Sequence, residues 1–440
     1  MSKLSMRYRQ SSWHTAYNLS SDSGKARIAL LLSCVPLAIV DGFTTGTFYS
    51  GLLVGYGINL VNISIISTIP NIASLLSFFT PYILKPFRKR RAVLSAAMIV
   101  YYLLNILGIT LLPELVHDET GRIIGLIAIV FVANAFKSLF SGYSAWHMPY
   151  LVPEVRNVCH TANTLVTSIA SSVVMLIAGA VVDAADGPMQ LTIISTLRYI
   201  SFAFSLLYVW LMQLPKEPEY AESSNRASLL DVLRKPMKDH AFRTTTLINC
   251  LSFAIANFTS GAYSAWLLED IGVSYFYINL INSLFPAFII GTYAFWNRFV
   301  RTRGKIKTYV IFLIIEGVAY ILLSFISNSN YIWLMTISTL TLHAITLGQT
   351  FSLTNLYYEN LPLKDQTAHT SFYDLTQHVS IFLGMSLGTW TLAIIDDHPI
   401  WLFGMNISGM PLLILLKALM YILLALFVLK VRRSLTPSGK

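Results

Sequence analysis

The sequence predicts an all-α integral membrane protein with twelve transmembrane helices in two six-helix bundles. Of the 440 residues, 55% are hydrophobic and only 12% are charged, whereas a soluble domain carries about 25% charged residues. The apolar residues form runs of about 20, the length of helix that crosses the roughly 30 Å hydrocarbon core of a bilayer. Because these runs lack the two-residue alternation of barrel strands, they are predicted to be helices.

The polar segments between the apolar runs divide the chain into two tails, two bundles and a linker. The expected spans are 28–52, 58–83, 92–112, 122–147, 160–182, 196–214, 243–268, 275–296, 307–327, 331–356, 369–395 and 409–430. The expected domains are a tail at 1–26, a first bundle at 27–214, a linker at 215–242, a second bundle at 243–431 and a tail at 432–440. The linker is polar and of mixed charge, and it separates six spans from six.

The distribution of basic residues predicts the orientation of the loops. One set, which includes both termini and the segments near 85–91 and 298–307, is rich in Lys and Arg. The opposite set is rich in acids and contains only two basic residues, Arg122 and Arg198. Because Lys and Arg concentrate in cytoplasmic loops, both termini are predicted to be cytoplasmic. The same loops account for the net charge of +10, so no nucleic-acid partner is expected.

An internal duplication relates the two halves of the chain. The stretch 27–46 aligns with 243–261 when Gly42 is omitted, and in that register Asp41 corresponds to Asn257. Further matching residues recur 209 to 216 positions apart. Since both halves contain six spans in the same order, they are predicted to be parallel repeats, related by a pseudo-two-fold axis along the membrane normal.

With these features the chain resembles the major facilitator superfamily of secondary transporters, and the resemblance covers nearly all of it. Six spans, a linker and six further spans match the family, as do basic loops after the second and eighth spans. The family's signature of glycines and an Asp-Arg pair keeps only its basic end at 81–91, while the copy at 297–305 has Asn297 at the place of the acid. The segment 153–157 is similar to the family's Pro-Glu-x-x-Arg-Gly motif, with Asn157 in place of glycine.

The resemblance implies two bundles that rock around a central cavity and expose a midplane site to each side of the membrane in turn. It places spans one, four, seven and ten at the cavity, with spans two, five, eight and eleven beside them. Spans three, six, nine and twelve are implied to be peripheral. Structural roles are therefore predicted for Glu316 in span nine and for Lys417 in span twelve.

Ionisable side chains inside the spans are the first candidates for a functional site, because they are costly in lipid and usually face a cavity or a partner. Asp41 lies in span one, and Thr44 and Thr45 follow it at helical spacing on the same face. An acid at this place can take a proton from one side of the membrane and release it on the other. Asp41 is therefore predicted to couple transport to a proton or sodium gradient, with solute contact and a structural role as alternatives.

A second set of residues is predicted to bind the solute. These residues are Lys137, Asn134, Asn257, His343, Tyr49 and Tyr263. Lys137 can hold an anionic group of the solute or pair with Asp41, and the alternative is a snorkelling lysine. His343 falls within one helical turn of the position that corresponds to Lys137, and a satisfied core histidine is the alternative. The tyrosines can stack on a ring of the solute or anchor the protein at the membrane interface.

A gate is predicted near the cytoplasmic end of the protein. Asp374 and His378 are four residues apart in span eleven and so share one face of the helix. Arg88 and Arg301, in the basic loops after spans two and eight, complete the predicted gate. A solvated helix face is the alternative interpretation for the pair on span eleven.

The motifs of several other classes are absent from the sequence. There is no phosphate-binding Gly-Lys-Ser/Thr loop, no metal-ligand cluster and no readable catalytic set, so neither an enzyme nor an ATP-driven pump is predicted, and no cofactor is expected.

The predicted function is secondary active transport of a small polar or zwitterionic organic solute, with a sugar as the first guess. The protein is expected to act as a monomer in the bilayer of an inner or plasma membrane, coupled to a proton or sodium gradient. The alternatives are a sensor or partner-binding protein that keeps the transporter fold, and a lipid or drug exporter. The solute, the coupling ion and the direction of transport stay open.

Overall fold

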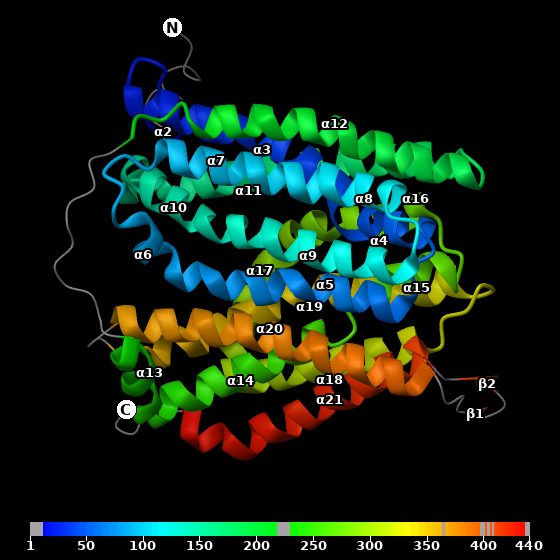
Figure 1. The fold of residues 1–440 in the computed structure, drawn as a ribbon. Coiled ribbons are helices and arrows are strands. Elements are labelled where there is room, and N and C mark those ends of the chain that lie inside the picture. Colours follow the sequence, from blue (N-terminus) through cyan, green and yellow to red (C-terminus); the bar gives the residue numbers. More distant parts are fainter. Residues whose placement is uncertain are drawn as a thin grey trace, which may run out of the picture. The chain divides into compact units, whose positions relative to one another are not determined.

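The computed structural model describes residues 12–217, 229–362, 366–396, 401–402, 405–406 and 409–435 (Figure 1). Helices make up nearly all of this part of the chain, and its two strands, β1 (Trp401–Leu402) and β2 (Met405–Asn406), form a short antiparallel pair. Eleven helical segments in the described ranges are long and apolar enough to cross a membrane. The described part of the chain is therefore almost entirely helical, and its helices are those of a multi-pass membrane protein, as the sequence predicts.

The first half of the chain contains the helices α2 to α12. Their bounds are α2 (Ser12–Ala16), α3 (Asp22–Thr44), α4 (Gly46–Gly55), α5 (Leu60–Ser74), α6 (Thr80–Leu84), α7 (Arg91–Tyr102), α8 (Ile109–Leu115), α9 (Glu119–Lys137), α10 (Ser141–His147), α11 (Pro153–Asp183) and α12 (Pro188–Met212). Shorter helical turns join some of them, namely η1 (Leu75–Phe79), η2 (Leu103–Gly108), η3 (Ser138–Phe140) and η4 (Met148–Tyr150).

The second half contains the helices α13 to α21. Their bounds are α13 (Leu229–Lys238), α14 (His240–Asn257), α15 (Tyr263–Glu269), α16 (Tyr275–Ser283), α17 (Phe285–Arg303), α18 (Lys305–Ser324), α19 (Tyr331–Asn360), α20 (Gln366–Asp396), α21 (Met410–Val431) and η5 (Arg432–Leu435). Parts of the predicted tails and linker, at 1–11, 218–228 and 436–440, lie outside the described residues.

Short polar side chains explain where several helices begin. Ser21, Asp118 and Asp239 precede α3, α9 and α14, and each accepts a hydrogen bond from the backbone N–H three residues further on. Such a cap satisfies one of the N–H groups that the first turn of a helix leaves free. Gly187 and Gly409 precede α12 and α21 with positive φ angles of 51° and 67°, so the sixth helix of each half starts in the same way.

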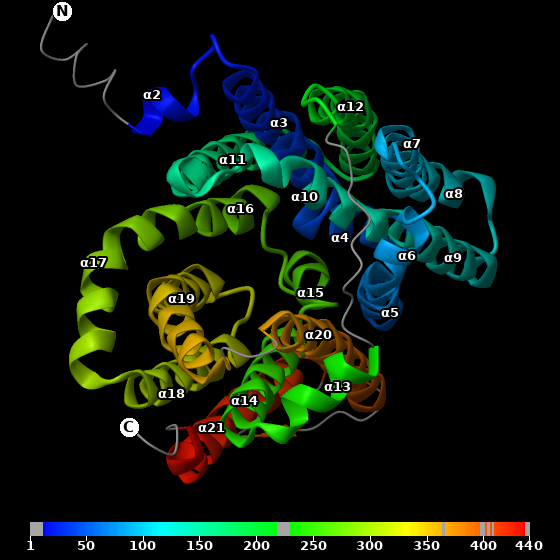
Figure 2. The ribbon, with the colours of Figure 1, turned by 90° about the vertical axis from the view of Figure 1, so that its left-hand side faces the viewer.

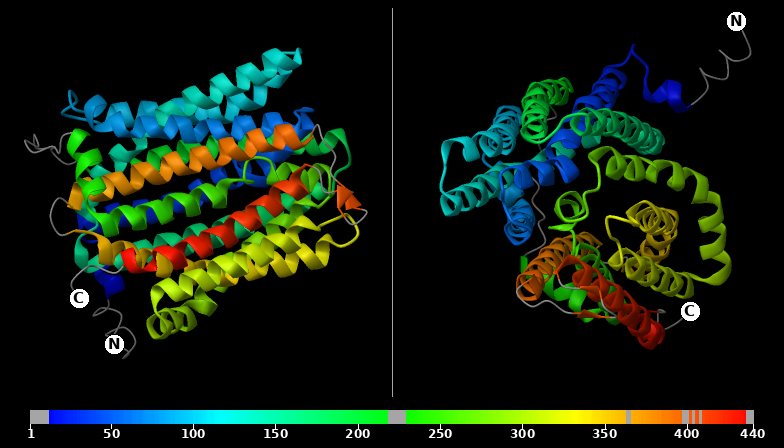
Figure 3. Two further views of the ribbon diagram at one scale, coloured as in Figure 1. Left: turned by 90° about the horizontal axis from the view of Figure 1, so that it is seen from below. Right: turned by 90° about the vertical axis from the view of Figure 1, so that its right-hand side faces the viewer.

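The chain folds into two compact units. Unit 1 comprises Met1–Ile58, Ala73–Glu222 and Ser274–Ser283, and unit 2 comprises Asn59–Ile72, Ser223–Val273 and Leu284–Lys440. In unit 1, α3 packs against both α11 and α12, as the view along the helices in Figure 2 shows. In unit 2, α21 runs beside α18 and α14 (Figure 3). Most of α5 thus groups with the second half of the chain, and α16 groups with the first half.

The segment α16 is fastened to α11 within unit 1. The carboxylate of Asp183, the last residue of α11, accepts the backbone N–H groups of Tyr275 (2.9 Å) and Phe276 (2.7 Å) at the start of α16. The ring of Tyr275 stacks on that of Phe48, with 5.7 Å between the centroids. The short segment is therefore held by a helix cap and by an aromatic contact.

The first long helix of each half breaks at a corresponding place. In the first half, α3 ends at Thr44 and α4 begins at Gly46, whose φ angle is 57°. In the second half, the predicted span 243–268 is divided, because α14 ends at Asn257 and a turn separates it from α15. Asp41 and its counterpart Asn257 both lie in the last turn before the break.

Arg198 of α12 is fully buried and binds the end of α3. Its Nη1 donates to the carbonyl oxygen of Thr44 (3.5 Å), its Nη2 donates to that of Asn105 (2.6 Å), and its Nε donates to the hydroxyl of Thr110 (2.7 Å). Asn105 lies in η2, a π-helical turn, and such turns interrupt the regular hydrogen bonding of a helix. The expectation that Arg198 belongs to an outer loop is wrong, because the residue lies inside α12.

Lys417 of α21 holds the end of α14 in a similar way in unit 2. Its side chain is buried, and its Nζ donates to the carbonyl oxygen of Ala256 (2.7 Å) and to the hydroxyl of Thr259 (3.2 Å). The same nitrogen lies 4.2 Å from the centroid of the Tyr320 ring. Since the carbonyls at the C-terminal end of a helix carry partial negative charge, a cation is favourable at both breaks.

Two glycines of α20 let it approach the backbone of α14. A methyl group at Gly384 would overlap the carbonyl oxygen of Ala254, and one at Gly388 would overlap that of Phe258, at the break of α14. Glycines four residues apart on one helix face commonly allow such close packing in membranes. The contact between α20 and α14 therefore depends on the absence of side chains at these positions.

Gly388→Ala is expected to destabilise the protein by about 1–3 kcal/mol, because the backbones of α20 and α14 would have to move apart. Thermal unfolding of the purified protein in detergent measures the effect. The control is Gly291→Ala in α17, where an added methyl group would meet no atom within 4 Å. An unchanged unfolding temperature for Gly388→Ala would contradict the packing described here.

Candidate functional site

Asp41 and Lys137 carry opposite charges in one accessible part of unit 1. Asp41 is exposed, although its neighbours Val40 and Gly42 are buried, and Lys137 at the end of α9 is exposed as well. The two charges are close enough to act on each other. No ion pair within 4.0 Å joins these two described side chains, so each retains polar atoms for another partner.

Tyrosines from two further helices surround this pair of charges. The Nζ of Lys137 lies 5.3 Å from the centroid of the Tyr101 ring on α7. Tyr102 of α7 and Tyr208 of α12 lie within electrostatic reach of Asp41, and their rings meet edge to face with 6.2 Å between the centroids. We call these five residues the Asp41 site, and they come from α3, α7, α9 and α12.

Two predicted solute-binding residues of unit 1 have other partners. The side chain of Asn134 is buried, and its Nδ2 donates to the carbonyl oxygen of Val130 on the same helix (2.8 Å). The ring of Tyr49 faces Arg198, with the guanidinium carbon 5.9 Å from the ring centroid. Tyr49 therefore packs beside the cation that holds the helix break, and solute contact stays a prediction for both residues.

The predicted solute-binding residues of unit 2 are placed beside aromatic rings or bonded to their own helix. His343 lies 5.1 Å from the ring centroid of Phe285. The Nδ2 of Asn257 donates to the carbonyl oxygen of Phe253 (2.9 Å), and the ring of Tyr263 lies 6.0 Å from that of Trp266. For each of these residues, a role in solute binding also stays a prediction.

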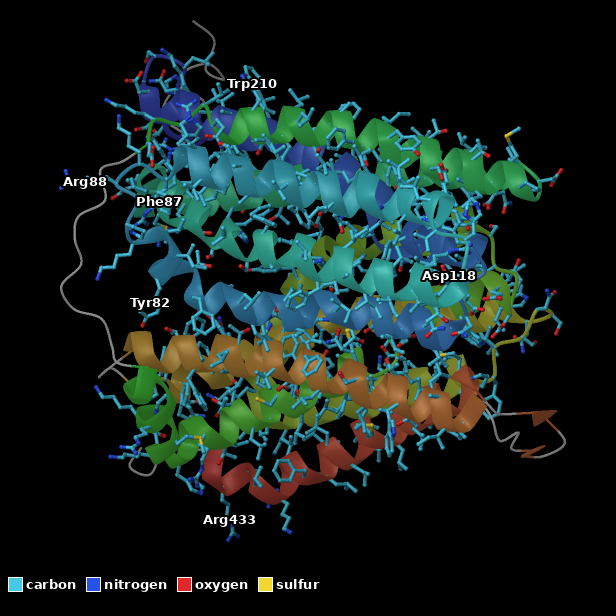
Figure 4. The ribbon with its side chains drawn as sticks, viewed as in Figure 1. Tyr82, Phe87, Arg88, Asp118, Trp210 and Arg433 are labelled. Carbon is cyan, nitrogen blue, oxygen red and sulfur yellow. The ribbon has the colours of Figure 1, made fainter. Side chains whose placement is uncertain are left out.

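The predicted gate residues are all exposed. Asp374 and His378 lie on one face of α20 in unit 2, within electrostatic reach of each other, and Arg301 lies in the last turn of α17 in the same unit. Arg88, labelled in Figure 4, belongs to unit 1. It lines an open pocket of about 1120 Å³ together with Trp210. Lys89, Arg91 and Lys216 also line this pocket, so its wall is strongly basic.

Sequence reasoning did not assign a site to Glu316, which lines a pocket of about 160 Å³ in unit 2. We call this space the Glu316 pocket, and its lining consists of Ser252, Phe253, Ala256, Glu316, Gln349, Thr350, Leu353 and Tyr421. The Nε2 of Gln349 donates to Oε2 of Glu316 at 2.9 Å. The carboxylate thus reaches a cavity, although its helix is one that the family resemblance places at the periphery.

The internal repeat contains a signal that points to this pocket. Tyr102, Lys137 and Tyr208 of the Asp41 site have Glu316, Gln349 and Tyr421 as their counterparts, at separations of 214, 212 and 213 residues. These separations lie within the range that the sequence repeat establishes. The two sites therefore share corresponding positions of the third, fourth and sixth spans, whereas Asn257, the counterpart of Asp41, does not line the Glu316 pocket. In this register His343 lies six residues before the counterpart of Lys137, more than the expected one helical turn.

The fold and these sites together define a class of protein. A set of membrane-spanning helices with charged side chains inside the spans is typical of membrane transporters. A sequence profile of the Major Facilitator Superfamily matches residues 31–385. The chain therefore belongs to the Major Facilitator Superfamily, as its sequence features predict.

Solved structures with the same fold are transporters of several kinds. The nucleoside transporter NupG is 13% identical, with 93% of this chain and 99% of that chain covered and a TM-score of 0.64. A bacterial homologue of the iron transporter ferroportin, in an inward-facing state, is 16% identical, with 94% and 99% covered and a TM-score of 0.65. A POT family transporter in complex with 5-aminolevulinic acid is 13% identical, with 92% and 96% covered and a TM-score of 0.62. A comparison with curated protein sequences gives no match.

Proposed function

We propose that the protein is a secondary active transporter of a small polar or zwitterionic organic solute. The observation that carries this proposal is the Asp41 site, where an acid and a lysine inside membrane-spanning helices are exposed and not directly paired. A buried ion pair would satisfy both charges and leave little for a ligand. Here the lysine is available for an anionic group of the solute, and the acid is available for a proton or a sodium ion.

The proposed mechanism is alternating access by twelve spans in two six-helix bundles. Asp41 would bind the coupling ion on one side of the membrane and release it on the other, and Lys137 would hold the solute. We further propose a monomer in an inner or plasma membrane with both termini in the cytoplasm, which the basic residues near 85–91 and 298–307 support.

Solute counterflow in proteoliposomes tests the proposed function. Vesicles containing the purified protein are loaded with one unlabelled compound at a time, and entry of the same labelled compound is followed. The compounds are sugars, sugar acids, amino acids, amines and nucleosides. We expect transient accumulation above equilibrium for one class and none in protein-free vesicles. Counterflow with no member of the panel would contradict transport and favour a sensor with a transporter fold.

Alternating access also requires the contact between α16 and α11 to open. Asp183→Ala removes the carboxylate that accepts two backbone N–H groups of α16, and is expected to favour opening by about 1–2 kcal/mol, a factor of about 5–30 in population. A cysteine replacing the buried Asn279, in a background without native cysteines, would then react faster with an impermeant thiol reagent.

The matched control for this prediction is Asp186→Ala, three residues further on. Asp186 is exposed, and its backbone carbonyl accepts a hydrogen bond from the N–H of Met189, which the substitution retains. We expect the control to leave the reaction rate unchanged. Equal rates for both variants would show that the Asp183 cap does not hold α16 in place.

A further inference from the structure

We infer that the Glu316 pocket binds a protonated primary amine, which is the positively charged group of the transported solute. The claim that this amine belongs to the transported solute rests on the proposed transport function, whereas binding of an amine to the pocket can be tested without transport. The pocket lies entirely within unit 2, between α14, α18, α19 and α21, and its volume of about 160 Å³ suits a small group rather than a whole solute.

The carboxylate of Glu316 has a free oxygen at this pocket. Its Oε2 accepts the hydrogen bond from Gln349, and among the described residues its Oε1 has no hydrogen-bond partner. The residue is 8% exposed. Since Oε1 lacks a hydrogen-bond partner and is not fully buried, it is accessible to a small probe. Because Glu316 lines the cavity, this exposure places an unsatisfied acceptor at the surface of the pocket.

Lys417 lies close enough to act electrostatically on Glu316, but it forms no direct ion pair with the carboxylate. No ion pair within 4.0 Å joins the described side chains of Glu316 and Lys417. The Nζ of Lys417 instead donates to Ala256 and Thr259 and lies over the ring of Tyr320. A carboxylate inside a membrane-spanning helix is costly unless it has a partner, so a cation that enters the pocket would gain a strong electrostatic interaction.

The lining of the pocket favours an ammonium group over a metal ion. An ammonium group has three N–H donors and no acceptor, which suits the free oxygen of Glu316. Phe253 and Tyr421 also line the pocket, and aromatic faces attract organic cations. The hydroxyls of Ser252 and Thr350 donate their protons to backbone carbonyls of their own helices, so their oxygens face a ligand as acceptors, which suits the N–H groups of an ammonium group. Neutral or anionic groups of a solute would give the carboxylate of Glu316 no cationic partner inside the pocket.

The test measures thermal unfolding of the full-length chain, purified in detergent, with defined cations. Ethylammonium and benzylammonium chloride are compared with sodium, potassium and choline chloride at equal ionic strength, and with ethanol and benzyl alcohol as neutral isosteres. At saturating concentration we expect a primary amine to raise the unfolding temperature by about 3 °C or more, whereas choline and the alcohols give no shift.

Two variants assign the effect to the pocket. Glu316→Gln removes the charge, and Ala256→Leu fills the space while leaving every charge in place, so that one variant remains informative if the other does not fold. Both are expected to lose the amine-dependent shift. The matched control is Glu269→Gln, which neutralises an exposed carboxylate of the same unit outside the pocket and should retain the shift.

Each outcome of this experiment decides the inference. A shift that persists in Glu316→Gln or in a folded Ala256→Leu would overturn it, as would the absence of any shift with amines in the unaltered protein. A shift produced by sodium and not by amines would make the pocket a metal-ion site and would also overturn it. A Glu316-dependent amine shift without counterflow of any compound would support amine binding while contradicting the proposed transport function.

Discussion

Asp41→Asn is expected to abolish accumulation of the solute against its gradient while leaving counterflow intact. The amide has nearly the shape of the carboxylate, but it cannot gain and lose a proton and it binds a sodium ion far more weakly. Asp41 is exposed beside the charge of Lys137, so the substitution removes the acid from an accessible site and does not fill a packed core. Uptake into proteoliposomes with an imposed proton or sodium gradient measures the effect, and we expect a reduction to the background of protein-free vesicles.

The control for this prediction is Glu119→Gln, which neutralises an exposed acid in the first turn of α9. We expect this variant to keep full gradient-driven uptake. Full uptake by Asp41→Asn would rule out a coupling role for Asp41. Loss of both counterflow and driven uptake, in a well-folded protein, would instead assign Asp41 to solute binding.

Arg198→Met is expected to destabilise the protein by about 3–5 kcal/mol, more than Gly388→Ala. The guanidinium group makes three hydrogen bonds in a fully buried position, and methionine would leave the carbonyl oxygen of Asn105 and the hydroxyl of Thr110 without this donor. Arg198→Lys should recover only part of the loss, because an ammonium group cannot reproduce the planar arrangement of donors.

Thermal unfolding and the yield of monodisperse protein in detergent measure this loss. Arg303→Met is the matched control, since Arg303 is exposed at the end of α17. A variant Arg198→Met that unfolds at the same temperature as the control would show that the contacts of Arg198 contribute little to stability.

The helices could be predicted from the sequence because the length and polarity of each apolar run are local properties. The break between α14 and α15 could not, since the residues at 258–262 remain apolar enough to continue a span. It forms where Gly388 of α20 meets the carbonyl oxygen of Phe258 and where Lys417 binds Ala256 and Thr259. These contacts join parts of the chain that are far apart in sequence.

The sequence identifies the charged residues of the candidate sites, but not which of them face a cavity. Asp41 and Lys137 stand out as charges within apolar runs, and the structure brings them into one unit. Glu316 also stands out, but its position in the ninth span suggested a peripheral role. Whether a side chain reaches a cavity depends on helix rotation and on its neighbours, here Gln349 and Tyr421, which hydropathy does not describe.

The cations at the two helix breaks have a mechanical consequence. A broken helix is often a hinge, but Arg198 fixes the end of α3 to α12 and to the π-helical turn at 103–108, and so resists a change of angle there. The angle between α3 and α4 should then stay fixed. A displacement of α4 would therefore move the end of α3 with it, including Asp41, which lies one turn before the junction. Lys417 would restrict the angle between α14 and α15 in the same way. Flexibility for transport would then come from elsewhere in the chain than these bends.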